Sequence, residues 1–170
     1  MSNEEDNLIL DSVHRWLERD VAPYAHDLEQ ADEYPHAMIE QMKGLGLFGA
    51  TIDPEYGGLG LSASTYAKIV SAVCEVWMSL SGIFNSHLIM ARCIQSFGTE
   101  DQKQLWLPKL ASGELRGGIG LTEPDAGTDL QGIRCAAKKD GDHYVVNGTK
   151  SWITNSIEGA SAGGTPWKAQ

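Results

Sequence analysis

The chain of 170 residues has the length of one domain, or of one domain with part of a second. Apolar residues make up 42% and charged residues 21%, which favours a packed core over disorder. A net charge of −10, from 13 basic and 23 acidic side chains, argues against nucleic acid as a partner. The acidic start Met1–Asp6 and the lack of a long apolar run predict a cytoplasmic protein with no signal peptide and no membrane insertion.

Cysteine and histidine spacing does not support metal binding. The cysteines Cys74, Cys93 and Cys135 are odd in number and lack metal-ligand spacing, and the five histidines are scattered. We expect no metal site. We also expect the cysteines to be buried, as small apolar side chains in a reducing compartment.

The first 115 residues carry helical periodicity and predict a helical domain. Apolar residues between Leu8 and Leu17 recur at helical spacing, and Pro23 marks a break or a helix start. A second helix is expected over about Pro35–Lys43, where a glycine follows and ends it.

Three more helices are expected before residue 115. An apolar stripe over Tyr66–Trp77 predicts a helix that Ser62 or Ser64 caps. A buried helix follows over about Leu80–Phe97 and ends at a glycine. Thr99–Gln102 then has the residues of a capping box, which opens a helix that runs to about residue 110.

The segment Gly44–Gly49 has the spacing of the G-x-G-x-x-G dinucleotide fingerprint. That fingerprint has meaning only between a strand and the helix whose N-terminus holds the pyrophosphate. Here a helical pattern precedes the glycines, and the Pro/Gly-rich loop Asp53–Gly60 follows them. We therefore interpret the segment as a helix end leading into a tight loop and reject a Rossmann fold.

Beyond residue 115 the pattern changes to short strands and loops. Arg134–Lys138 and His143–Val146 flank a glycine-containing turn and predict a β-hairpin, and Lys150–Asn155 is expected to form another strand. The fold class is therefore mainly α, with an incomplete antiparallel β domain at 116–158. Residues 159–170 are rich in small residues and predict an unstructured tail.

Five ordered segments carry a family resemblance. They are Gly46–Gly49, Pro54–Gly58, Gly98–Lys103, Gly120–Gly132 (GLTEPDAGTDLQG) and Val146–Asn155 (VNGTKSWITN). Together they resemble the landmarks of the acyl-CoA dehydrogenase family, and the resemblance covers about residues 4–158. It implies a helical N-terminal domain followed by the start of a middle β domain.

The resemblance implies an FAD-dependent oxidoreductase that acts on CH–CH groups. In such an enzyme a carboxylate base removes the Cα proton of an acyl-CoA thioester, while hydride passes from Cβ to flavin N5. The implied partners are the acyl-CoA substrate and an electron-transferring flavoprotein or a similar acceptor. The full-length protein is expected to be a homo-oligomer.

The resemblance also implies the flavin-contacting residues. A flavin needs hydrogen-bond donors at its pyrimidine edge and a broad apolar surface against its ring. Thr122 would donate to that edge, Thr154 would lie near N5, and Thr128 would face both FAD and substrate. The complete implied cofactor-binding set is Ile119, Leu121, Thr122, Gly127, Thr128, Trp152, Ile153 and Thr154.

Each of these assignments has a structural alternative. For Trp152 the alternative is a place in the core of a sheet. For Thr122 and Thr154 the alternative is that they simply favour strand formation. For Glu123 and Asp129 we favour hydrogen bonds to nearby backbone N–H groups over a role as the base.

The acyl chain would lie near Ser81–Ile89 in the family pattern. For the interior apolar residues Phe84, Leu88 and Ile89, we favour a place in the core over one in an acyl pocket.

The resemblance places the catalytic glutamate in a C-terminal helical domain beyond residue 170, so no catalytic residue is assigned here. We therefore expect the 170-residue chain alone to lack dehydrogenase activity and to hold FAD weakly or not at all. Two alternatives stay open, a flavin-dependent monooxygenase or oxidase of the same fold, and a non-catalytic helical module that binds a partner.

Overall fold

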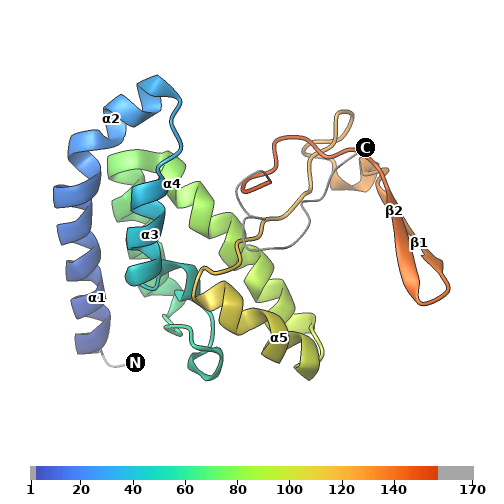
Figure 1. Cartoon of the computed structure of the whole chain (residues 1–170), viewed down its shortest axis with the longest axis horizontal. Helices are drawn as coiled ribbons and strands as arrows, with labels where there is room; N and C mark the ends of the chain where they lie inside the picture. Colours follow the sequence, from blue (N-terminus) through green and yellow to red (C-terminus); the bar gives the residue numbers. More distant parts are fainter. Residues whose placement is uncertain (1–2, 157–170) are drawn as a thin grey trace.

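The computed structural model describes residues 3–156 and consists of a helical body followed by a small hairpin (Figure 1). The helices are α1 (Asn3–Trp16), α2 (Ala22–Ala31), α3 (His36–Gly44), α4 (Ala63–Phe97) and α5 (Glu100–Ala111), and the strands are β1 (Ala136–Asp140) and β2 (His143–Asn147). This confirms the expected fold class. The expected tail at 159–170 lies outside the described residues.

Helix α4 is the centre of the helical body and packs against α1, α2 and α5. Ser62 begins it, because its Oγ accepts a hydrogen bond from the Thr65 N–H at 3.1 Å. The helix is kinked at Trp77, whose φ of −156° and ψ of 100° are not helical. The carboxylate of Glu29 on α2 accepts hydrogen bonds from the Trp77 indole and from Ser79 beyond the kink. The kink separates the two helices that the sequence predicts.

By length and composition, α4 is the one helix in residues 3–156 that could cross a membrane. Core helices of globular proteins have the same properties, and 44% of the most apolar window of α4 is buried inside this structure. Its side chains Leu80, Phe84 and Leu88 belong to the hydrophobic core. The apolar character of α4 is thus explained by packing.

The junction between α1 and α2 contains a π-helical turn over Leu17–Val21. Pro23 follows in the first turn of α2, where its missing N–H costs no helical hydrogen bond. The proline is therefore at a helix start, one of the two positions that the sequence allows. Leu17 and Val21 are both buried, so the junction still contributes to the core.

The glycine-rich segment after α3 is a helix end followed by a loop. Helix α3 ends at Gly44, Gly46 adopts a left-handed φ of 72°, and Leu47–Gly49 forms one 3-10 turn. The left-handed backbone explains the glycine at position 46. This agrees with our rejection of a Rossmann fold.

The capping box at the start of α5 is present as expected. The Thr99 hydroxyl accepts from the Gln102 N–H at 3.3 Å, and the Gln102 side chain accepts from the Thr99 N–H at 2.9 Å. Both hydrogen bonds satisfy backbone donors that a helix start leaves without partners.

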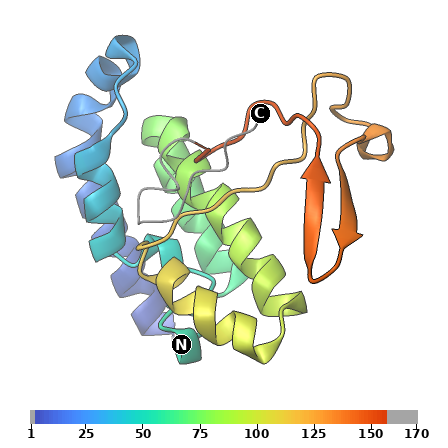
Figure 2. The ribbon, with the colours of Figure 1, turned by 45° about the vertical axis from the view of Figure 1, so that its right-hand side comes forward.

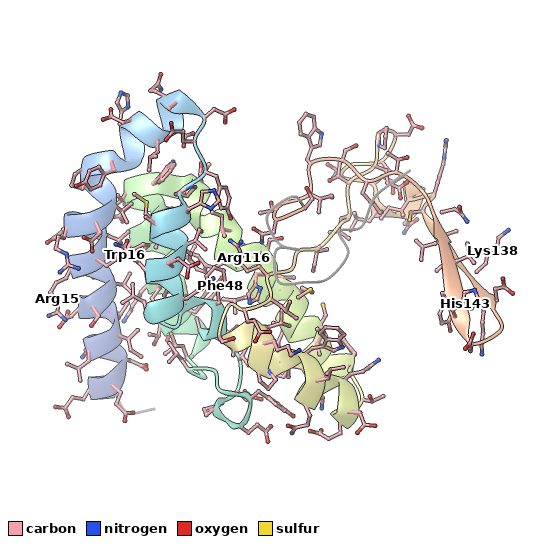
Figure 3. All side chains as sticks on the ribbon, viewed as in Figure 1. Arg15, Trp16, Phe48, Arg116, Lys138 and His143 are labelled. Atoms are coloured by element: carbon pink, nitrogen blue, oxygen red, sulfur yellow. The ribbon has the colours of Figure 1, made fainter. Side chains whose placement is uncertain are left out.

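Strands β1 and β2 form an antiparallel hairpin that extends away from the helices (Figure 2). Ala136 pairs with Asn147, and Asp140 pairs with His143 next to the turn. All ten strand residues are exposed, including Tyr144. Figure 3 shows Lys138 and His143 on this hairpin, well away from Phe48 in the helical body.

The predicted strand over Lys150–Asn155 and the predicted burial of the cysteines are both wrong. Lys150–Asn155 is not a strand, because Trp152 and Asn155 have left-handed φ values of 60° and 65° that interrupt an extended backbone. The cysteines are not buried. Cys74 and Cys93 lie on the solvent side of α4, and Cys135 is half-buried.

Phe84 and Ile89 lie on different faces of α4, since Phe84 is fully buried and Ile89 is 48% exposed. We predict that Phe84→Ala lowers the free energy of unfolding by about 3–5 kcal/mol, because it leaves a core cavity. The matched change Ile89→Ala should cost less than about 1 kcal/mol. Urea denaturation measures both, and equal losses would contradict this packing.

Candidate functional site

The two predicted flavin-contacting segments lie side by side. The Ser151 N–H donates to the Thr122 carbonyl at 2.9 Å. The Lys150 ammonium donates to the Leu121 carbonyl at 3.0 Å and to the Glu123 carboxylate at 2.8 Å. Segments that are separated by more than 20 residues in the sequence are thereby joined through backbone and side-chain contacts.

Glu123 holds three segments together. Its buried carboxylate accepts from Lys150, from the Arg134 N–H at 2.7 Å and from the Cys135 N–H at 2.9 Å. The hydrogen bond from Lys150, together with those from the two backbone N–H groups, lowers the pKa of Glu123 to about 2. A carboxylate with this pKa and these partners is a poor proton acceptor, which agrees with the structural interpretation.

Asp129 also has the structural role that we favoured. Its carboxylate accepts from the Gln131 N–H at 3.1 Å and begins the 3-10 turn Leu130–Gly132. Such hydrogen bonds to backbone two residues further on are typical of turn aspartates.

The structure places six of the eight predicted cofactor residues in two groups. Ile119, Leu121 and Thr122 lie on the first segment, and Trp152, Ile153 and Thr154 lie on the second. A Cβ added at Gly120 would lie 3.6 Å from Ile153 Cδ1, so the two groups are in close proximity. Gly127 and Thr128 are exposed on a separate turn, after the Glu123–Ala126 bridge.

The exposure of these residues bears on their structural alternatives. Trp152 is 92% exposed and therefore is not a core residue. Thr122 and Thr154 lie outside strands, so strand propensity does not account for them. Leu121 is 47% exposed, which leaves a second apolar side chain of the predicted set in solvent.

The residue that joins these segments to the helices is not among those predicted from the sequence. His87 on α4 is fully buried, and its Nε2 lies 3.1 Å from both the Phe48 and the Leu110 carbonyl oxygens. Its Nδ1 accepts from the Gly117 N–H at 3.3 Å. The one signal in the sequence is its position within the buried helix predicted over about Leu80–Phe97.

The hydrogen-bond partners of His87 determine its tautomer, and burial determines its charge. Nε2 faces two carbonyl oxygens and must carry the hydrogen, whereas Nδ1 faces an N–H group and must offer its lone pair. Burial lowers the pKa of His87 to about 4, and the charge of Arg116 acts in the same direction. The ring is therefore neutral near pH 7.

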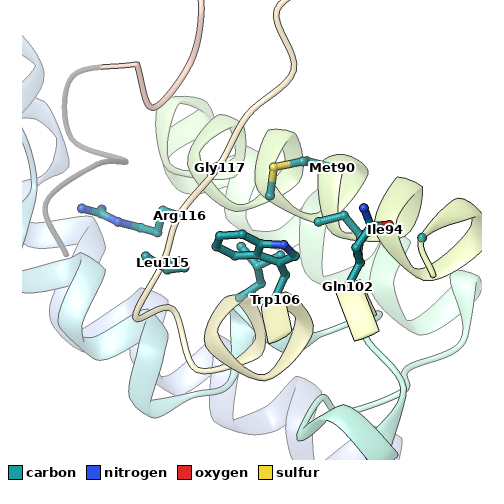
Figure 4. Close-up of a pocket in the computed structure, with 9 residues that line it drawn as sticks. Met90, Ile94, Gln102, Trp106, Leu115, Arg116 and Gly117 are labelled. Atoms are coloured by element: carbon teal, nitrogen blue, oxygen red, sulfur yellow. The ribbon is translucent and has the colours of Figure 1, made fainter. Parts of the chain in front are cut away.

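Two grooves lie along α4. One of about 430 Å³ lies between α4 and α5, with Met90, Trp106 and Gly117 on its walls (Figure 4). Another of about 570 Å³ includes Asn85, Leu88 and Ile89 in its lining.

Leu88 is thus both a core residue, 3% exposed, and part of a groove wall. Ile89 belongs to the groove rather than to the core that we favoured for it.

Within residues 3–156, no group of three or more His, Cys, Asp or Glu side chains is placed to hold a metal ion.

Two family models match the chain. Residues 3–114 match the acyl-CoA dehydrogenase N-terminal domain, and residues 118–162 match the acyl-CoA dehydrogenase middle domain. The chain belongs to the acyl-CoA dehydrogenase family. Members of this family are oxidoreductases that act on CH–CH groups.

Individual relatives support the same family. The (2S)-methylsuccinyl-CoA dehydrogenase of Cereibacter sphaeroides is 39% identical over 155 residues, which are 91% of this chain and 28% of that protein. The structure of an acyl-CoA dehydrogenase from Geobacillus kaustophilus matches with a TM-score of 0.81 and 37% identity, over 94% of this chain and 42% of its own.

A third match is a structure described as the electron transferring flavoprotein of Acidaminococcus fermentans. It has a TM-score of 0.86 and 33% identity, and the match covers 94% of this chain and 42% of that one. This acyl-CoA dehydrogenase family chain therefore spans well under half the length of these relatives.

We predict that folding becomes less stable as pH falls from about 6.5 to 4, because unfolded chains protonate the His87 imidazole before the folded protein does. Protonation of His87 in the unfolded chain lowers the free energy of unfolding by about 3 kcal/mol across that window. Above the window it has no effect on stability. The stability advantage of the wild type over His87→Gln should shrink by that amount. A constant difference across these pH values, measured by urea denaturation, would contradict the prediction.

Proposed function

We propose that this chain contributes the flavin-contacting part of an FAD-dependent acyl-CoA dehydrogenase. The observation that carries the proposal is the junction of the two motif segments, where Ser151 bonds to Thr122 and Lys150 bonds to Leu121. This junction brings hydroxyl, backbone and aromatic groups together while their side chains stay accessible. It fits the needs of a flat, mostly apolar ring with a polar edge.

The two sides of the proposed site have different roles. Thr122 and the backbone near Leu121 would bind the pyrimidine edge, where negative charge develops on reduction. Trp152 would pack beside the ring system, and Thr154 would lie near its reactive edge. When bound, FAD supplies the two-electron acceptor for the oxidation.

Ile119, Ile153 and Gly127 complete the proposed cofactor contacts. Ile119 and Ile153 are half-buried and supply apolar surface, and Gly127 has open space where a Cβ would lie. Thr128, which is exposed on the same turn as Gly127, would contact both FAD and the acyl-CoA substrate.

Lys150 and Glu123 would support the site rather than react. The Lys150 ammonium holds the Leu121 carbonyl, and Glu123 holds Lys150. The main chain at Leu121 is therefore fixed, so the backbone N–H groups near it can donate to a ligand without rearrangement.

We propose an acyl-CoA thioester as the substrate and an electron-transferring flavoprotein or a similar acceptor as the electron partner. The named relatives act as dehydrogenases on CoA esters or are described with an electron transferring flavoprotein, which supports a dehydrogenase over the monooxygenase alternative. Homo-oligomerisation and a cytoplasmic location stay predictions.

FAD titration tests the cofactor site. At high protein concentration we expect weak but saturable quenching of flavin fluorescence, and an affinity that falls a further five- to tenfold, roughly, in Thr122→Val, because one hydrogen bond to the cofactor is lost. Thr154→Val should also weaken binding.

Thr149→Val makes the same chemical change at an exposed position in the second motif and is the control. Unchanged affinity in both site variants, or an equal loss in all three, would refute the assignment.

A further inference from the structure

Both backbone polar groups of Gly117, which precedes the first motif, are hydrogen-bonded to side chains. Its N–H donates to His87 Nδ1 at 3.3 Å, and its carbonyl accepts from the Asn155 side-chain amide at 3.0 Å. The same amide donates to the Ile83 carbonyl of α4 at 2.9 Å. One glycine is thus connected to the central helix and to the end of the second motif.

The local packing leaves little freedom for this backbone. A Cβ at Gly117 would overlap the side chain of Met90 on α4, which Figure 4 shows next to the chain at this point. A Cβ at Gly118 would lie 2.5 Å from the Thr154 carbonyl oxygen. The glycines therefore allow the first segment to pass closely between α4 and the second segment.

The two side chains that hold Gly117 are themselves fixed. The Nε2–H of His87 is shared between the Phe48 and Leu110 carbonyls, and the ring packs edge-on against Phe48 at a centroid distance of 5.3 Å. Asn155 adopts a left-handed φ of 65° that directs its amide back toward α4. Neither side chain belongs to the proposed flavin contacts.

We propose that His87 and Asn155 are positioning residues, which set the proposed flavin-binding segments against α4 through the peptide of Gly117. This inference rests on the proposed function. Gly117 lies two residues before Ile119, and Asn155 directly follows Thr154. A shift of this peptide therefore displaces both sides of the flavin site at once.

Two substitutions of His87 distinguish a role in the stability of the helical core from a positioning role. In His87→Gln, the side-chain amide can still donate in place of Nε2–H, but the acceptor for Gly117 is lost. In His87→Asn, the amide oxygen replaces Nδ1 as the acceptor, but the Phe48 and Leu110 carbonyls lose their donor. The two variants therefore separate anchoring of the peptide from stability of the helical core.

Hydrogen exchange of the 170-residue chain without cofactor provides the first readout. We expect amide exchange over residues 117–122 to accelerate at least tenfold in His87→Gln and to stay near the wild-type rate in His87→Asn. The melting temperature should fall more in His87→Asn. Equal acceleration in both variants would reduce His87 to a core residue and overturn the inference.

Asn155→Gly provides an independent variant, because glycine adopts a φ of 65° without strain and only the amide is lost. We expect the same tenfold faster exchange over residues 117–122 with little change in melting temperature. An unchanged exchange rate would overturn the role of Asn155.

FAD titration provides the second readout. His87→Gln and Asn155→Gly should bind FAD about tenfold more weakly than the wild type, and His87→Asn should retain most of the affinity. Faster exchange with unchanged FAD affinity would overturn the positioning role. If the wild-type chain binds FAD too weakly to titrate, as we expect for the 170-residue chain alone, the exchange rates by themselves decide whether His87 and Asn155 anchor the backbone of Gly117.

Discussion

The arrangement of this protein depends on one buried imidazole. His87 lies in the C-terminal half of α4 and bonds to the carbonyls of Phe48 and Leu110 and to the N–H of Gly117. A buried polar group without partners costs about 1–3 kcal/mol, so each of these backbone groups has a reason to stay in place. This one side chain connects the loop after α3, the end of α5 and the start of the segment that leads into the first motif.

The same interaction relates the helical body to the proposed cofactor site. Functional loops are held more precisely when they are attached to rigid helices or strands. Helix α4 supplies the rigid element, and the Gly117 peptide connects it to the segment that contains Leu121 and Thr122. Glu123 and Lys150 then join that segment to the second one. The accessible groups of the proposed flavin site are therefore attached to the packed helical core through Gly117.

Local patterns predicted most of the fold. Helical periodicity identified α3 and both halves of α4, the residues Thr99–Gln102 predicted the cap of α5, and the Gly141 turn predicted the hairpin. These features depend on residues within a few positions of one another. Pattern reasoning works where the interactions that decide the structure are local.

Long-range contacts account for what the sequence did not predict. Asn155 bonds to Ile83, which is 72 residues away, and this contact accompanies the left-handed backbone that replaces the expected strand. His87 was not singled out because its partners lie 23 to 39 residues distant.

The family resemblance indicated which residues form the candidate site, and the contact of Ser151 with Thr122 joins its two segments. How these segments attach to α4 depends on side-chain geometry that no local pattern contains.

Nitrogen NMR of the His87 side chain, recorded at about pH 6, tests this account most directly. An ordinary exposed histidine is mostly protonated at that pH. We predict a neutral ring with its hydrogen on Nε2 and an unprotonated Nδ1 that accepts the Gly117 N–H. A doubly protonated ring, or a neutral ring with its hydrogen on Nδ1, would contradict the central role of this contact.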